Sequence, residues 1–252
     1  MTAIALCSVK HSPGATTAAL AACAAWSDGR DASPILVEAD PAGGDLAARL
    51  GVPFEPGLAS LAASARHPGR SILMADHARP LPCGGRVLLA PSIPEQASGA
   101  VRTLSPRLPA VIDESGGRGV VDCGRWSPES PASAVMATAE LTLVVVHADL
   151  AGVDHLRSRL PALQDVVRDR LLLALTGGSP YPPREVERAT GVGVLGVIPR
   201  DPRAVAALHG GRQSRTLDRS SLLRAMRSML ECLAPSGERA PRRAPAVRMA
   251  RA

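Results

Sequence analysis

The chain has 252 residues, of which 46% are hydrophobic and 21% charged, so it is long and apolar enough to form a packed core. Aromatic residues make up only 2% of it, which excludes the aromatic platforms on which proteins stack single-stranded nucleic acid. The net charge is +6, partly because arginines gather near the C-terminus. The five cysteines have no CxxC spacing, and no apolar run approaches the ~20 residues that span a bilayer, so we expect a cytoplasmic protein without a disulfide framework.

Buried strands and helices alternate along the sequence. The segments with the pattern of buried strands are 3–9, 34–38, 86–90, 119–122, 141–147, 171–175 and 192–198. The segments with helical patterns are 16–26, 57–65, a helix that starts near Pro94, 150–167, 185–189 and 218–233. Apolar strands that alternate with helices predict a three-layer α/β/α fold with a mostly parallel, doubly wound sheet, whose functional loops follow the carboxyl ends of the strands.

The C-terminal region contains a last helical pattern and a basic segment. Leucines and methionines recur at helical spacing in residues 218–233, which fits either a closing helix that docks on the sheet or a helix on a membrane surface. We favour the docked helix because the pattern contains few basic residues and no aromatic anchor. Residues 234–252 are rich in Pro, Ala and Arg without periodicity, so we predict one domain over 1–233 and a disordered basic tail over 234–252.

Residues 10–17 lie between the first predicted strand and the first predicted helix. A loop in this place directs backbone N–H groups and the start of a helix at an anion, which suits phosphate. The loop contains Lys10, the only lysine among the 29 Lys and Arg residues. An ammonium group on a flexible stem differs from a guanidinium, so its retention here favours a specific task. The alternative is an ordinary turn in which Ser12 or Thr16 caps the helix.

Acidic residues follow two of the other predicted strands. Glu38 and Asp40 lie at the end of the second strand, and Asp122 ends the strand at 119–122. Because parallel strands present their carboxyl ends at one edge of a sheet, we expect these carboxyl groups near the loop at 10–17. The alternative is that acids at strand ends cap the helices that follow them.

Taken together, these segments resemble the ParA/MinD ATPases over about residues 1–233. The deviant phosphate loop of that family has the pattern KGGxGK[ST][ST], and this chain has the loop Lys10-His11-Ser12-Pro13-Gly14-Ala15-Thr16-Thr17. Two glycines of the pattern are replaced by His11 and Ser12, and its second lysine by Ala15. The segment 38–41 resembles the family's D-x-D-P motif, and the strand ending at Asp122 resembles Walker B.

The resemblance implies a site for ATP and Mg²⁺. It implies two catalytic residues: Lys10, which would reach the phosphates of a partner subunit's nucleotide, and Asp40, which would orient water at the γ-phosphate. The implied magnesium ligands are Thr16, Asp40 and Asp122. The implied nucleotide contacts are Lys10, Ser12, Pro13, Gly14, Ala15, Thr16 and Thr17, together with Pro199 and Asp201 of a late segment that resembles the family's loop beside adenine. Thr176 stands where the family has an adenine-binding Asn.

The resemblance also implies a cellular role. With Ala15 in place of lysine, the chain resembles a nucleotide-binding or pseudo-ATPase positioning and assembly factor of the CpaE/TadZ type, related to pilus, secretion or septum machinery. This implies a homodimer, a protein partner in a membrane-associated machine, and a place in the cytoplasm, at the inner face of the membrane or on the nucleoid. Arginines would contact DNA or anionic lipid. The alternative is an active ATPase for chromosome or plasmid partitioning that binds DNA non-specifically.

Overall fold

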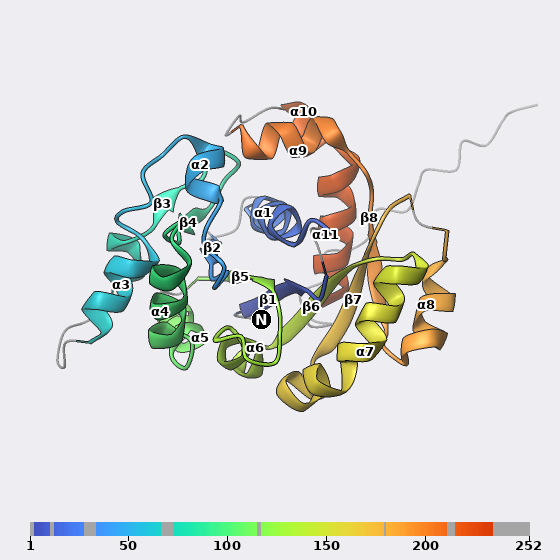
Figure 1. The fold of residues 1–252 in the computed structure, drawn as a ribbon. Coiled ribbons are helices and arrows are strands. Elements are labelled where there is room, and N and C mark those ends of the chain that lie inside the picture. Colours follow the sequence, from blue (N-terminus) through green and yellow to red (C-terminus); the bar gives the residue numbers. More distant parts are fainter. Residues whose placement is uncertain are drawn as a thin grey trace, which may run out of the picture.

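The computed structural model describes residues 3–10, 13–27, 34–66, 73–114, 117–178, 180–210 and 215–233. Its centre is a twisted sheet covered by helices on both faces (Figure 1). The strands are β1 Ala3–Ser8, β2 Ile35–Glu38, β3 Arg79–Pro80, β4 Arg86–Leu88, β5 Gly119–Arg125, β6 Leu141–His147, β7 Leu171–Thr176 and β8 Val194–Ile198. Within the described residues the sheet has eight strands in the order β3-β4-β2-β5-β1-β6-β7-β8. Only the pairing of β3 with β4 is antiparallel in this sheet, so the predicted mostly parallel, doubly wound fold is confirmed.

The helices form one layer on each face of the sheet. Their bounds are α1 Ala15–Trp26, α2 Leu46–Leu50, α3 Leu58–Ala65, α4 Pro94–Leu104, α5 Leu108–Glu114, α6 Ser133–Thr138, α7 Leu150–Val167, α8 Pro183–Thr190, α9 Pro202–His209, α10 Arg215–Asp218 and α11 Ser221–Leu233, with a 3-10 turn η1 at Met74–Asp76. One core lies between the sheet and α1, α2, α9, α10 and α11 (Figure 1). A second core lies between the opposite face and α3 to α8. The predicted three layers are therefore present.

The central strands bring their C-terminal ends to one edge of the sheet. β1, β2 and most of β5 are buried and largely apolar, as expected for strands covered on both faces. Leu6 of β1 and Glu38 of β2 both lie opposite Asp122 of β5 in the register of the sheet. The first loop and the acidic strand ends consequently meet at this edge.

Helix α1 is held against the sheet by small side chains. Its buried positions are mostly alanine, and the helix contacts both β5 and α11. Alanine has the highest helix propensity and little volume, so the helix forms readily and its backbone can lie close to both neighbours. This packing places the start of α1, at Ala15, beside the ends of β1 and β5.

Helix α11 packs on the same core, and its position decides between the docked helix and the membrane-surface helix considered for residues 218–233. Its buried residues are Leu222, Leu223, Met226, Met229 and Leu230. Met229 packs against Gly196 of β8 so closely that a Cβ at Gly196 would lie 2.7 Å from the Met229 Cγ. The helix is docked on the sheet, as favoured, and its apolar face is not free for a membrane surface. None of the described helices is both long and apolar enough to cross a membrane. The tail predicted at 234–252 lies outside the described residues.

Candidate functional site

The loop between β1 and α1 leads into a helix start that no described side chain caps. Gly14 is the N-cap residue and has a φ of 92°, a left-handed conformation that favours glycine. The first turn of α1 contains no acidic residue. The amide groups of this turn can therefore serve an anion from outside the chain. Ser12, which we predicted as a nucleotide contact, lies with His11 outside the described residues.

Lys10 is directed to a helix of its own chain. Its ammonium group donates a hydrogen bond to Nε2 of His155, which lies 145 residues away on α7. An ammonium group is a donor only, so the His155 ring accepts at Nε2 in this contact. Lys10 is thus tied to α7 in the structure, whereas its predicted contact with a partner's nucleotide stays a prediction.

Asp122 is a buried carboxyl group with spare bonding capacity. It is 1% exposed, and its Oδ1 accepts a hydrogen bond from the Gly124 amide at 3.1 Å. Its Oδ2 is buried without a hydrogen-bond partner among the described residues. Burial raises the pKa of Asp122 to about 7; hydrogen bonds from the Thr16 hydroxyl and the Gly124 amide oppose the shift, and the charges of Asp40 and Glu38 add to it. Thr16 and Asp122 are therefore in contact, and their role as metal ligands stays a prediction.

Asp40 lies over the end of β5. Its Oδ1 accepts the Ala42 amide at 2.8 Å. A Cβ placed on Gly124, which has a φ of 61°, would lie 2.0 Å from the Asp40 Cγ, so the carboxyl group fills the space that a side chain would occupy. Burial raises the pKa of Asp40, helped by the charge of Asp45 and opposed by the Ala42 amide and by Arg125. The structure thus brings Thr16, Asp40 and Asp122 to the same edge of the sheet.

The side chains at this edge form an incomplete cage for a cation. Among the described residues, no group of three or more His, Cys, Asp or Glu side chains could hold a metal ion by itself. Magnesium in nucleotide sites usually keeps several waters and takes one or two protein oxygens together with phosphate oxygens. A hydroxyl next to a buried carboxyl oxygen without a partner fits that mode, so the predicted metal ligands are compatible with Mg²⁺ only when phosphate and water complete the shell.

Glu38, the other acid at the end of β2, has a structural role that our reading of the sequence treated only as the alternative. It is 1% exposed, and its Oε1 accepts the amides of Asp45 at 2.8 Å and Leu46 at 2.9 Å. Its Oε2 accepts the Ala90 amide at 3.0 Å. Burial raises the pKa of Glu38 and the three amides oppose that shift. The side chain therefore caps the start of α2 and ties it to the segment after β4.

The late segment at β8 and α9 places its acid in a second structural role. Asp201 accepts the Ala204 amide at 3.0 Å as the N-cap of α9, and its other oxygen accepts the Ser221 amide at 3.1 Å and hydroxyl at 2.8 Å. These hydrogen bonds lower the pKa of Asp201. Pro199 lies beside Gly177, where a Cβ would be 3.3 Å from the Pro199 Cα. The nucleotide contact predicted for Pro199 and Asp201 stays a prediction, and the Asp201 oxygens are already engaged within the chain.

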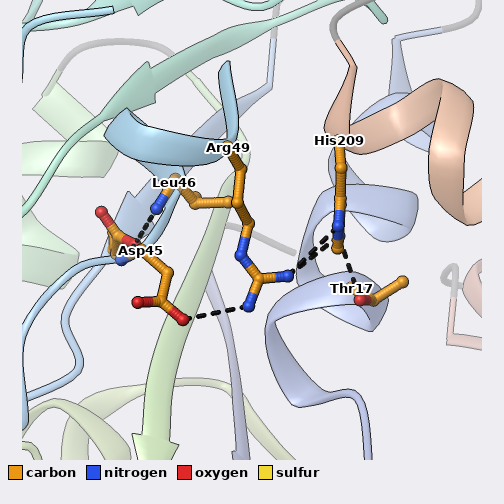
Figure 2. A network of polar contacts seen from close by, with 6 residues as sticks. Thr17, Asp45, Leu46, Arg49 and His209 are labelled. Carbon is orange, nitrogen blue, oxygen red and sulfur yellow. Dashed lines mark hydrogen bonds and ion pairs between the residues drawn. The ribbon is translucent and has the colours of Figure 1, made fainter. Parts of the chain in front are cut away.

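A polar cluster on the outer side of α1 was missed by the sequence analysis. Thr17 Oγ1 lies 3.1 Å from His209 Nε2, and Arg49 Nη1 lies 3.1 Å from His209 Nδ1 (Figure 2). Arg49 Nη2 also donates to Asp45 Oδ2 at 3.0 Å. The residues come from α1, α2 and α9, and 160 positions separate Arg49 from His209. No spacing in the sequence signals such a contact; only the folded arrangement shows it. We name Thr17, Arg49 and His209 the threonine-arginine-histidine cluster.

The fold is of the α/β type found in P-loop nucleoside triphosphatases. Neither a comparison with models of protein families nor one with curated protein sequences finds a match. Solved structures, however, share the fold over most of the chain. A ParA family ATPase from Chlorobium tepidum TLS matches with a TM-score of 0.75 and 19% identity, over 91% of this chain and 98% of that one.

Two further solved structures carry a nucleotide. The septum site-determining protein MinD from Pyrococcus horikoshii OT3, complexed with Mg-ADP, matches with a TM-score of 0.69 and 21% identity, over 92% of this chain and 95% of that one. A McdA variant from Cyanothece in complex with ATP matches with a TM-score of 0.69 and 19% identity, over 92% and 96%. The chain therefore has the fold of the ParA and MinD ATPases, which the sequence resemblance predicted.

Proposed function

We propose that this chain binds a nucleotide with Mg²⁺ and acts as a nucleotide-gated positioning or assembly factor of the ParA/MinD type, with slow or absent hydrolysis. The observation that carries the proposal is the contact between Thr16 and Asp122 beneath the uncapped start of α1, in which one buried carboxyl oxygen has no partner among the described residues. A buried acid of this kind is expensive for the folded chain unless a ligand uses it.

The residues at the strand edge have distinct tasks in this proposal. The first-turn amides of α1 would bind the phosphates, because the helix start offers unpaired N–H groups. Thr16 Oγ1 and Asp122 Oδ2 would hold Mg²⁺, which neutralises phosphate charge when it is bound. Because a nearby cation favours the charged carboxylate, Asp122 would release its proton as the site fills. Asp40, over Gly124, is the acid placed to orient a water molecule.

Slow hydrolysis follows from the charges that the loop lacks. Ala15 offers no charge to the phosphates at the position where the family resemblance expects the second lysine. Lys10 donates to His155 within the same chain and would have to leave that contact to serve a partner. Stabilising the charge of transferring phosphoryl groups is the main catalytic task in such sites, so these two features favour binding over turnover.

The proposed assembly is a homodimer with a protein partner. Among the solved structures with this fold is a complex of the cell division proteins MinC and MinD from Aquifex aeolicus, at a TM-score of 0.71 and 13% identity. We extend that arrangement to this chain as part of the proposal, with a place in the cytoplasm, at the inner membrane face or on the nucleoid. Since the apolar face of α11 is buried, contact with the envelope would come through the partner or through residues 234–252.

Calorimetric titration with ADP and ATP in the presence of Mg²⁺ tests the proposal. The wild type should bind, and Asp122→Asn and Thr16→Ala should each weaken Mg²⁺-dependent binding by about tenfold or more, because each removes one oxygen ligand. Asp165→Asn, an exposed acid on α7, is the matched control and should bind as the wild type does. Absence of nucleotide binding by the folded wild type would refute the proposal.

The alternative function, an active partitioning ATPase, gives different results in the same assays. It predicts Mg²⁺-dependent phosphate release that Asp40→Ala abolishes, and DNA binding that falls steeply with salt and is lost on deleting residues 234–252. Our proposal predicts ATP-dependent thermal stabilisation with little phosphate release. Lys10→Ala tests the dimer separately: it should remove ATP-dependent dimerisation while leaving the fold intact.

A further inference from the structure

The threonine-arginine-histidine cluster places two basic side chains in contact beside the first turn of α1. The guanidinium group of Arg49 is a donor only, so at 3.1 Å it donates to Nδ1 of His209. Nδ1 therefore carries no proton, and Nε2–H donates to the Thr17 hydroxyl at 3.1 Å. His209 is neutral in this arrangement. In agreement, burial and the neighbouring charge of Arg49 both lower the pKa of His209.

The positive charge of Arg49 is only weakly balanced. Its ion pair with Asp45 lies at the surface, where the Asp45 side chain is 71% exposed and that of Arg49 35%. Exposed pairs of this kind contribute little and are easily exchanged for another partner. The guanidinium group is therefore accessible. It contacts His209, whose pKa is lowered by burial and by the charge of Arg49.

The threonine-arginine-histidine cluster lies beside the part of the predicted phosphate loop that lacks a positive charge. Thr17 follows Thr16 on α1, and the amides of this turn have no side-chain cap among the described residues. Ala15 contributes no cation, and the Lys10 ammonium is turned to His155 on α7. Figure 2 shows the His209 ring in contact with both the Arg49 guanidinium group and the Thr17 hydroxyl, which come from two other helices. A guanidinium group with a fork of donors is the side chain best suited to bind a phosphate in such a place.

We propose that Thr17, Arg49 and His209 form a phosphate-binding site beside the start of α1, in which Arg49 supplies the charge that Ala15 lacks. The ligand class is a phosphate-bearing anion with two or more phosphates, such as pyrophosphate or a nucleoside diphosphate. In its nucleotide form the site rests on the proposed function. On binding, Arg49 exchanges its surface pair with Asp45 for the phosphate, while the Thr17 hydroxyl, which accepts from His209 Nε2–H, donates its own proton to the phosphate.

Titration calorimetry with pyrophosphate and, separately, with Mg-ADP tests this site. Arg49→Gln should weaken binding of both by about tenfold or more, and Arg49→Lys should retain part of it, because a lysine keeps the charge but loses the fork. Arg188→Gln, an exposed arginine on α8, is the matched control and should change neither affinity. Thermal unfolding without ligand should be alike for the Arg49 and Arg188 variants.

The Asp45→Asn variant controls for the possibility that the Arg49 variants lose binding only because they lose structure. Removing the competing carboxylate frees Arg49, so binding of both ligands should tighten by about twofold to fivefold. An unfolded or distorted variant could not produce that gain. An unchanged or weaker affinity in Asp45→Asn would count against the site.

The outcomes separate this inference from the proposed function. If Mg-ADP binds equally well to the wild type and Arg49→Gln, the inference fails and the proposed function stands. If pyrophosphate binds through Arg49 but Mg-ADP does not bind at all, the site stands and the proposed function fails. If neither ligand binds to the folded wild type, both fail.

Discussion

Two carboxyl groups face each other in register across β2 and β5, equally buried and differently bonded. Glu38 and Asp122 are each 1% exposed, and burial raises the pKa of both. Three backbone amides fill the bonding capacity of Glu38, whereas Asp122 keeps one oxygen without a partner among the described residues. Burial of an acid therefore does not mark a functional site in this fold. The two acids differ in unused bonding capacity, and the free oxygen of Asp122 is the one that the proposed ligand would use.

The largest change in stability is expected at Glu38. Glu38→Ala leaves three buried amides without an acceptor, so the free energy of unfolding should fall by about 3–5 kcal/mol. Chemical denaturation measures the loss, with Glu95→Ala, an exposed acid on α4, as the control. A loss below about 1 kcal/mol would mean that water replaces the carboxylate and that Glu38 is not a structural cap.

In the absence of ligand, replacing Asp122 should change the free energy of unfolding in the opposite direction from replacing Glu38. The folded pKa of about 7 lies above the ordinary value for Asp, so the folded chain holds a proton that the unfolded chain releases. Stability should therefore fall as pH rises from about 4 to about 7 and stay low above that range. Asp122→Asn does not titrate, and at pH 8 it should raise the free energy of unfolding by about 1–3 kcal/mol relative to the wild type. Equal stabilities at pH 8 would show that burying the Asp122 carboxylate does not destabilise the folded chain.

Gly124 tests whether Asp40 belongs with Asp122. Gly124→Ala puts a Cβ into the space of the Asp40 carboxyl group and places a side chain at a φ of 61°. We expect a loss of about 1–2 kcal/mol in the free energy of unfolding. If Asp40 contributes to the site, nucleotide binding should weaken beyond the effect of Gly51→Ala, a glycine at positive φ with open space around it. Equal binding by the two variants would separate Asp40 from the site.

The smallest effect is expected at Asp201, which like Glu38 has both carboxyl oxygens in hydrogen bonds but lies at a more exposed position. Asp201→Ala removes the cap of α9 and the tie to Ser221, and should lower the free energy of unfolding by about 1 kcal/mol. The pKa of Asp201 is lowered by these hydrogen bonds, so its contribution is present above about pH 4 and is lost as pH falls below that value. A difference between wild type and variant that grew at low pH would contradict this role.

The sequence was sufficient for the architecture because hydrophobic patterning decides it. The apolar runs at β1, β2, β5, β6 and β7 could only be strands of a covered parallel sheet, and the structure has them there. Short elements without periodicity, such as α2, α6 and the two-residue β3, were not predicted, because tertiary contacts rather than local patterns hold them. The helix predicted at 218–233 starts later, at Ser221, because Asp218 ends the separate short helix α10.

The candidate site, too, has a part that the sequence could predict and a part that only the folded structure shows. The positions of Thr16, Asp40 and Asp122 could be inferred, because each lies near the carboxyl end of a strand and these ends had to lie at the same edge. Whether an acid at that edge is filled or free could not, since the amides of Asp45, Leu46 and Ala90 reach Glu38 only in the fold. His209 and Arg49 were beyond sequence reasoning for the same reason: 160 residues separate two side chains that meet over Thr17.

The contact between Lys10 and His155 has a practical consequence, because Lys10 is the only lysine in the chain. An amine-directed reagent has a single side-chain target, and that target adjoins the loop at the start of α1. A fluorophore attached there would report on the loop without any engineered cysteine. The extent of acylation would itself follow the freedom of the ammonium group, since a group that donates to His155 or to a bound anion reacts more slowly than one in water.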